Sequence, residues 1–313
     1  NLQESQAAVL LAPLPARPVL HLFHRTRDLL ERVNDYLKPV TVDFEQDVLT
    51  LTPAGNATER HLCEAIAKKA AAHFDTEKEL EDYWQKKLDM SPDDMDLPAG
   101  PAIQGAIRKK TMKKGGVGYV QPGQDSYPLL ADMNKFVVQA GGIPVIAWLD
   151  GTTEGEQEME KLCRTAMATG AAALNIIPAR NYTPGKRDEK LHNLYQVVDL
   201  CRKLKLPVLA GTEMNSPTNK IVNDFESPEL KPLWDDFYHG AMITVGHAAL
   251  QRNAGLGYLS DWASSTFRDK EEKNNFFAEV GQLLNNKVIT ALNEVSDSMN
   301  PHQIIDLIKS TRS

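Results

Sequence analysis

The sequence has few cysteines, few aromatic residues (7%) and no long apolar run. Its three cysteines, Cys63, Cys163 and Cys201, lack the close spacing of a metal or redox motif, so we interpret them as buried thiols in a reducing, cytoplasmic compartment. No apolar run reaches the roughly 18–20 residues of a membrane span. Residues 7–14 are apolar but lack the preceding basic region of a signal peptide. We therefore expect a protein without a membrane partner.

A positive charge excess is also missing. The formal net charge is -7, which argues against a nucleic-acid partner because a phosphate backbone selects positive surface. A small anionic substrate needs only a local basic patch and stays compatible with this charge. The chain has 313 residues, 42% of them hydrophobic and 25% charged, as in ordinary globular proteins. This length is enough for one large α/β domain or two smaller ones.

What the sequence does contain is an alternation of apolar runs and amphipathic segments. Short apolar runs typical of buried strands occupy residues 142–150, 171–178, 206–210 and 240–246. Residues 154–169 and 190–205 between them have helical apolar spacing. Two earlier runs, 40–44 and 116–121, fit strands less cleanly. Strands separated by helices predict parallel β/α units, and so an α/β fold: a (β/α) barrel-like parallel sheet related to the TIM barrel, either incomplete, distorted or open.

The predicted domain organisation follows from this alternation. We expect a barrel-like catalytic domain over residues 1–267, with a helical insertion at about 75–110 whose acidic, Asp- and Pro-rich first part is a surface excursion. Residues 268–313 are expected to form a C-terminal extension of two helices packed on the barrel. Asn300 followed by Pro301 predicts the start of its second helix. A homo-oligomer formed through this extension is one expectation.

Polar side chains stand where each of four predicted strands ends. Asp150 follows the first, and Arg180 and Asn181 follow the second. Glu213 and Asn215 follow the third, and His247 the fourth. The ends of parallel strands meet at one mouth, so we expect an acid/base or metal site for a polar or phosphorylated substrate. The alternative is structural: Asp150 caps a loop, Glu213 pairs with Arg180, and His247 is a hydrogen-bonded core histidine.

Two further groups are weaker candidates for substrate binding. The basic run 108–116, RKKTMKKGG, contains Lys113 and Lys114 followed by paired glycines, a pattern that can hold a phosphate. A solvated loop is the alternative. Glu59 and His61 stand in the first turn of the helix predicted after residue 56, where either a site role or a helix-surface role is open.

Two segments carry a resemblance to a known family. GGIPVIAWLDG resembles the Gly-Gly-x-x-x-x-Ala-His-Pro strand of the polymerase and histidinol phosphatase (PHP) superfamily, and LPVLAGTEMNSP resembles its closing Gly-Ser-Asp-x-His-x-Pro strand. The resemblance covers roughly residues 141–217. It implies a distorted β/α barrel that binds two or three divalent metals and hydrolyses phosphate esters. Here Trp148 stands in place of a metal-binding histidine, Glu213 and Asn215 replace the aspartate and histidine, and the His-x-His strand is absent.

The resulting hypothesis is a metal-dependent hydrolase of a small phosphorylated or sugar-like substrate. Asp150, Glu213 and His247 would supply catalysis and ligands for Mn, Mg or Zn. Arg180, Asn181, Asn215 and the lysines would hold the substrate. Two alternatives stay open. One is a sugar isomerase or aldolase-type barrel that uses carboxylate acid/base chemistry. The other is a catalytically inactive barrel that acts as a binding or assembly subunit.

Overall fold

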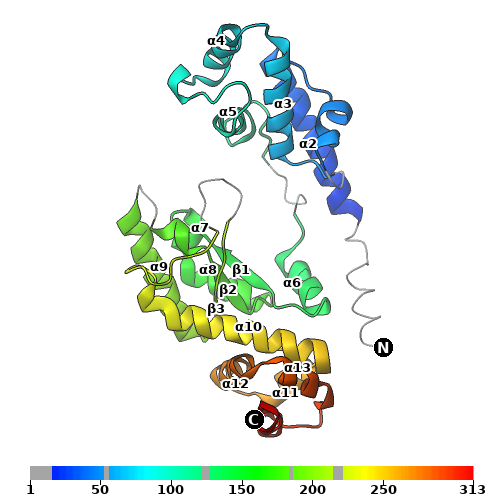
Figure 1. Ribbon diagram of the computed structural model, residues 1–313, viewed down its shortest axis with the longest axis vertical. Coiled ribbons are helices and arrows are strands. Elements are labelled where there is room, and N and C mark those ends of the chain that lie inside the picture. Colours follow the sequence, from blue (N-terminus) through cyan, green and yellow to red (C-terminus); the bar gives the residue numbers. More distant parts are fainter. Residues whose placement is uncertain (1–15, 53–55, 122–126, 183–185, 214–220, 313) are drawn as a thin grey trace. The chain divides into compact units, whose positions relative to one another are not determined.

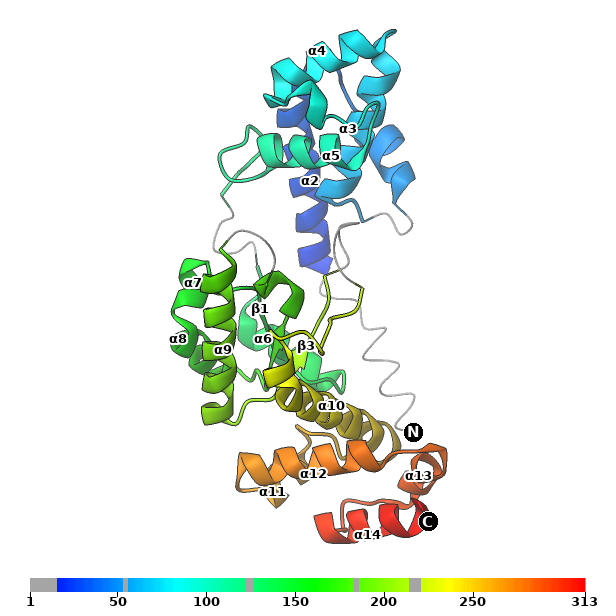
Figure 2. The same cartoon turned by 60° about the vertical axis from the view of Figure 1, so that its left-hand side comes forward.

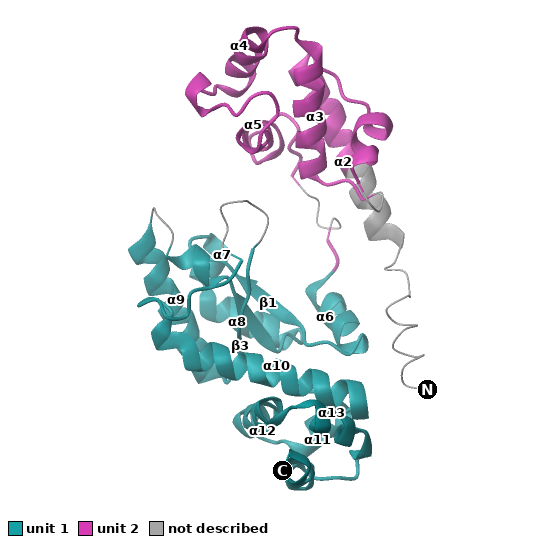
Figure 3. Ribbon diagram, viewed as in Figure 1, with its two compact units in different colours: residues 1–12, 129–313 teal, residues 13–128 magenta. Residues whose placement is uncertain are grey.

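The computed structural model describes residues 16–52, 56–121, 127–182, 186–213 and 221–312. The chain divides into two compact units, one of residues 13–128 and the other of residues 129–313 together with 1–12 (Figure 3). Each unit has hydrophobic core clusters built from its own residues.

The unit of residues 13–128 is helical. Its elements are α2 (Ala16–Leu37), η1 (Phe44–Val48), η2 (Leu49–Leu51), α3 (Glu59–His73), α4 (Glu77–Leu88), η3 (Pro92–Asp94), α5 (Pro101–Ile107) and η4 (Arg108–Met112). Thr58 is the N-cap of α3. The core contains the fully buried side chains of Val33, Ile66, Trp84 and Ile103. Trp84 lies in α4, so the stretch expected to be a surface excursion supplies core residues instead.

Neither early strand predicted in this unit forms. Residues 40–43 precede the helical turn η1, and the side chain of Asn34 bonds both the N–H and the carbonyl of Val42, at 3.0 and 2.8 Å. Residues 116–119 form turns: the Gly118 N–H donates to the Thr111 carbonyl at 2.8 Å and the Tyr119 N–H to that of Gly116 at 3.0 Å. Local hydrogen bonds thus take the place of strand pairing in both segments.

Unit 1, residues 129–313 together with 1–12, contains a parallel sheet of three strands in the order β1-β2-β3, namely β1 (Val145–Trp148), β2 (Ala173–Ile176) and β3 (Val208–Ala210). The connections contain α7 (Glu154–Gln157), α8 (Met159–Ala168), η6 (Pro178–Asn181) and α9 (Arg187–Leu204). Helices α8 and α9 lie on the same side of the sheet (Figures 1 and 2). Their buried residues, such as Cys163 and Val198, share one core with Trp148 and Ile176. Three of the predicted strands and both predicted helices are confirmed, so the β/α alternation was correctly identified here.

The barrel prediction is wrong. Among the described residues the sheet has three strands and stays open. The predicted fourth strand, residues 240–246, lies inside the long helix α10 (Trp234–Ala254), which follows η7 (Lys231–Leu233). Its two glycines are close-packing positions: a Cβ on Gly240 would stand 1.9 Å from the Val208 carbonyl oxygen, and one on Gly246 2.0 Å from that of Phe277. Glycine therefore lets α10 approach β3 and a neighbouring helix backbone to backbone.

The other elements described in this unit are helices. Helix α6 (Leu130–Gln139) precedes β1, and α10 is followed by α11 (Asp261–Thr266), α12 (Lys270–Leu283), α13 (Asn286–Ala291), η8 (Leu292–Glu294) and α14 (Pro301–Arg312). Figure 1 shows α12 beside α10, and both contribute to one core that includes Ile243 and Phe277. The C-terminal tail after residue 268 thus holds three α-helices where two were expected. Asn300 caps α14 as predicted, accepting from the Gln303 N–H at 3.0 Å. None of the helices within the described ranges is both long and apolar enough for a membrane span.

Candidate functional site

The carboxyl-terminal end of the sheet brings together charged side chains from all three strands. Asp150 follows β1, Arg180 lies in η6 after β2, and Glu213 follows β3. Arg180 Nη1 lies 2.6 Å from Glu213 Oε2, and Arg180 Nη2 lies 3.8 Å from Asp150 Oδ2. We call this group the sheet-edge site. Because parallel strands end at one edge, the structure brings these three of the predicted residues together.

Asp150 is the buried member of the sheet-edge site. Its side chain is 7% exposed and accepts hydrogen bonds from Thr152 Oγ1 at 2.6 Å and from the Thr152 N–H at 3.2 Å. Lys190 Nζ lies 3.2 Å from its second oxygen. Burial alone would raise the pKa of Asp150, but the hydrogen bonds from Thr152 and Lys190 outweigh it, so the pKa is lowered and the carboxylate stays charged. Asp150 thus also caps the loop after β1, as its structural alternative held.

Arg180 and Glu213 form the accessible part of the site. Their side chains are 38% and 29% exposed, and they pair directly, as the structural alternative for Glu213 expected. The half-exposed guanidinium of Arg180 contacts two carboxylates. An incoming anion can displace the accessible Glu213 while the buried Asp150 stays in place. The bidentate geometry of guanidinium suits a phosphate or a carboxylate for this exchange.

Asn181 positions the strand ends and does not face the solvent. It is fully buried, and its Nδ2 donates to the Leu149 carbonyl at 2.9 Å and to the Ile177 carbonyl at 3.1 Å. It therefore ties the end of β1 to the end of β2. Asn215, predicted to bind substrate at the same strand end as Glu213, lies outside the described residues.

Two side chains at this edge were not singled out from the sequence. Lys190 stands in the first turn of α9 and pairs with Asp150. Asn223 donates from Nδ2 to the Gly211 carbonyl at 3.1 Å and so holds the segment that leads to Glu213. The rule that a helix following a strand begins near the strand end would have identified Lys190. Asn223 lies too far along the chain for any local rule.

His247 is not part of the sheet-edge site. It was expected at a strand end but lies within α10, where its Nε2 bonds the Gly141 carbonyl at 3.0 Å and its Nδ1 accepts from the Tyr258 N–H at 3.0 Å. Burial lowers its pKa from the ordinary value, and the bond to Gly141 offsets this only in part. With both ring nitrogens in use, it is the hydrogen-bonded core histidine of the structural alternative.

The metal prediction is therefore corrected. The described residues contain no group of three or more His, Cys, Asp or Glu side chains arranged to hold a metal ion. Of the three predicted ligands, His247 uses both nitrogens elsewhere, while Asp150 and Glu213 share a cationic arginine whose charge opposes that of a metal. These side chains do not fit the multi-metal centre that the family resemblance implied.

The remaining candidates belong to the other unit. Glu59 Oε2 accepts from Arg108 Nε and Lys113 Nζ, each at 2.7 Å, and these partners outweigh burial, so the pKa of Glu59 is lowered. His61 Nδ1 accepts from the Thr58 N–H at 3.1 Å and so closes the first turn of α3. Lys114 is exposed. Three of these four predicted substrate-binding residues thus have structural partners, whereas Lys114 has no ion-pair partner among the residues that the structure describes.

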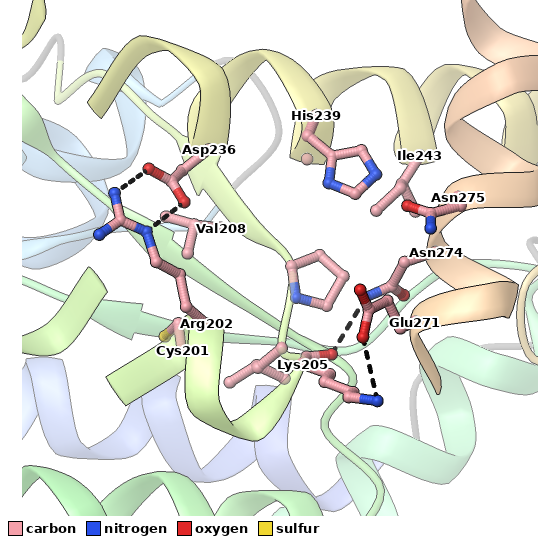
Figure 4. A pocket seen from close by; sticks show the side chains of 13 residues that line it. Cys201, Arg202, Lys205, Val208, Asp236, His239, Ile243, Glu271, Asn274 and Asn275 are labelled. Carbon is pink, nitrogen blue, oxygen red and sulfur yellow. Dashed lines mark hydrogen bonds and ion pairs between the residues drawn. The ribbon is translucent and has the colours of Figure 1, made fainter. Parts of the chain in front are cut away.

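A pocket of about 240 Å³ lies where β3 begins, between α9, α10 and α12 (Figure 4). Its charges compensate one another: Arg202 pairs with Asp236 at 2.6 Å, and Lys205 pairs with Glu271 at 3.1 Å. Buried Asn274 donates to the Lys205 carbonyl at 3.1 Å. We interpret the ion pairs and hydrogen bond of this pocket as structural contacts that fix the start of β3.

Comparisons of the chain with protein-family models, with curated proteins and with solved structures gave no match.

Proposed function

We propose that this protein is a hydrolase that binds a small phosphorylated or sugar-like substrate at the sheet-edge site. The observation that carries the proposal is the Arg180 guanidinium, half exposed and shared between the carboxylates of Asp150 and Glu213 at the ends of three parallel strands. The resemblance to the PHP superfamily agrees with this substrate class.

The proposed chemistry follows from the exchange of partners at Arg180. An anionic substrate binds the guanidinium and displaces Glu213 from its ion pair. Loss of a neighbouring positive charge raises the proton affinity of a carboxylate, so the displaced Glu213 becomes a better general base. It then takes a proton from the water that attacks the phosphorus, while the bond from phosphorus to the sugar oxygen breaks and the leaving sugar oxygen takes a proton from solvent. Asp150, held by Lys190 and Thr152, stays charged and keeps Arg180 in place.

The test is the isosteric variant Glu213→Gln. Phosphate release from a panel of sugar phosphates should fall by about 10²–10⁴-fold, the usual contribution of a general base. Glu160→Gln is the matched control because Glu160 also pairs with an arginine, Arg164, but on the exposed surface of α8. It should keep full activity. Equal activity in the Glu213→Gln protein and the unchanged protein would refute the proposed role.

One observation favours a second candidate, a binding protein without catalysis. Both carboxylates of the site are held in ion pairs, and the partners of Asp150 lower its pKa, which makes it a weak base. In that case Glu213→Gln would release Arg180 and tighten the binding of an anion, with no turnover by either protein. Thermal-shift titration with the same sugar phosphates separates the two candidates.

The isomerase that the sequence left open has a different signature. An isomerase would exchange substrate protons with deuterated solvent.

A further inference from the structure

The unit of residues 13–128 contains a pocket of about 620 Å³ beside the basic run. Lys109, Lys110 and Lys114 line it together with Gly115 and Gly116. The rest of the lining comes from α2 (Tyr36), from the end of α4 and the turn after it (residues 88–91), from η3 (Asp94), from α5 (Ala106) and from Val117. We call it the lysine pocket. Its volume falls within the range of small-molecule and cofactor sites, about 300–1,000 Å³.

The charges of the lysine pocket are only partly compensated. Lys110 pairs with Asp89. Lys109 and Lys114 are exposed and form no ion pair with any residue that the structure describes. Asp94 is the other acid in the wall. Two ammonium groups in one concave site attract a multiply charged anion, and a single carboxylate can accept hydrogen bonds from the ligand's hydroxyl groups.

The backbone of the basic run adds donors. Gly115 has φ +92°, a conformation that glycine adopts without strain, and the turn closes through the bond from the Gly116 N–H to the Lys113 carbonyl at 2.7 Å. Within the described part of the chain, the N–H groups of Lys114 and Gly115 donate to no acceptor. Open N–H groups beside lysines at a glycine turn are the usual elements of phosphate recognition.

Part of the lining is apolar. It consists of Tyr36, Leu88, Met90 and Val117, which we call the apolar wall, and Asp89, Ser91 and Asp94 line the pocket beside them. Val117 is 45% exposed, and the Tyr36 ring is held by its hydroxyl, which donates to the Lys87 carbonyl at 2.7 Å. An inorganic anion would leave the apolar wall unused. A ligand with a charged end and a flat apolar end would contact both the lysines and the apolar wall.

We propose that the lysine pocket binds a nucleoside phosphate. Lys109, Lys114 and the open N–H groups would take the phosphates, Asp94 a ribose hydroxyl, and the apolar wall the base. This pocket and the sheet-edge site belong to different units. The proposal for the lysine pocket does not depend on whether the sheet-edge site is catalytic.

The experiment is titration calorimetry of the full chain with ATP, in a buffer of low ionic strength without divalent metals. ATP should bind, and the double variant Lys109→Ala/Lys114→Ala should weaken it at least about tenfold, since each charged hydrogen bond contributes substantially. The matched control is Lys135→Ala/Lys161→Ala. It removes two exposed lysines of the other unit that also have no ion-pair partner among the described residues, and binding should stay within about twofold.

Two additional arms test the assignment. Lys109→Arg/Lys114→Arg keeps both charges and should restore binding, which shows that the loss in the alanine variant is not misfolding. Inorganic tripolyphosphate should bind more weakly than ATP because it cannot use the apolar wall. The proposal is overturned if ATP does not bind, if the control weakens binding equally, or if tripolyphosphate binds as tightly as ATP.

Discussion

His247 and Asp150 are titratable side chains with little solvent exposure, and each is held in one charge state by its neighbours. Asp150 stays ionised because Thr152 and Lys190 donate to it. His247 stays neutral because one nitrogen accepts a hydrogen bond from Tyr258 N–H, which leaves that nitrogen unprotonated. The first arrangement preserves a charge at the sheet edge, and the second fixes α10 to the loop before β1.

The neutral state of His247 predicts a pH dependence of stability. Burial lowers its pKa below the ordinary 6.5, so the unfolded chain takes up this proton at a higher pH than the folded chain. Its contribution to the free energy of unfolding is complete above about pH 6.5 and decreases as the pH falls from there toward the lowered pKa. His247→Gln should remove this decrease and also cost about 1–3 kcal/mol at pH 7.5 through lost hydrogen bonds.

Denaturant unfolding at pH 7.5 and pH 5 measures both effects. His192→Gln is the control because His192 is exposed on α9, so it should change neither value. An unchanged pH slope in the His247→Gln protein would contradict the neutral, structural histidine.

The residues of the sheet-edge site show what can and cannot be predicted from the rule that the ends of parallel strands meet. Asp150, Arg180 and Glu213 were predictable because the ends of parallel strands meet, and only strand positions were needed. His247 was misplaced because the same rule was applied to a segment that is a helix. Lys190 was missed because the rule was not extended to the first turn of the helix that follows β2, although its partner, Asp150, is 40 positions away in the sequence.

At the scale of elements, helix α10 explains why residues 240–246 were wrongly predicted to form a strand. Residues 240–246, GAMITVG, are apolar with glycine at both ends, which is typical of a short strand between turns. The buried positions of the helix are 237, 240, 243, 246, 247 and 250, a helical spacing in which two members are glycines. Because a glycine adds no hydrophobicity, the apolar stripe looked interrupted. Its role in close packing depends on residues far away in the sequence.

This role predicts the effect of Gly246→Ala. The added methyl group would meet the Phe277 carbonyl oxygen at 2.0 Å, and backbone cannot move as a side-chain end can, so α10 and α12 must separate. We expect a loss of about 1–3 kcal/mol or more in the free energy of unfolding. Gly155→Ala in α7 is the control: nothing lies within 4 Å of its new methyl group, and it should be neutral or stabilising by up to about 1 kcal/mol. Similar melting curves for both variants would refute the packing role.

At the scale of the whole molecule, the sequence suggested one barrel, whereas the structure has two units with separate cores. The three consecutive β/α segments were locally clear, and extending them to a closed barrel assumed strands elsewhere. Whether residues 40–44 and 116–121 pair into a sheet depends on distant partners, and in the structure local turns satisfy their backbone instead. Closure is a property of the complete sheet, and no single segment encodes it.

Separate cores predict separate unfolding. Ile66 is fully buried in the core of residues 13–128, and Phe277 is fully buried in a core of the other unit. Truncation of either to alanine should cost about 2–5 kcal/mol, but only within its own unit, because a cavity weakens the contacts that surround it. Hydrogen exchange followed by mass spectrometry should show lost protection confined to residues 29–112 for Ile66→Ala and to residues after 129 for Phe277→Ala. If each variant lowered protection equally in both units, the chain would be one cooperative body, and the lysine pocket and the sheet-edge site would be coupled through it.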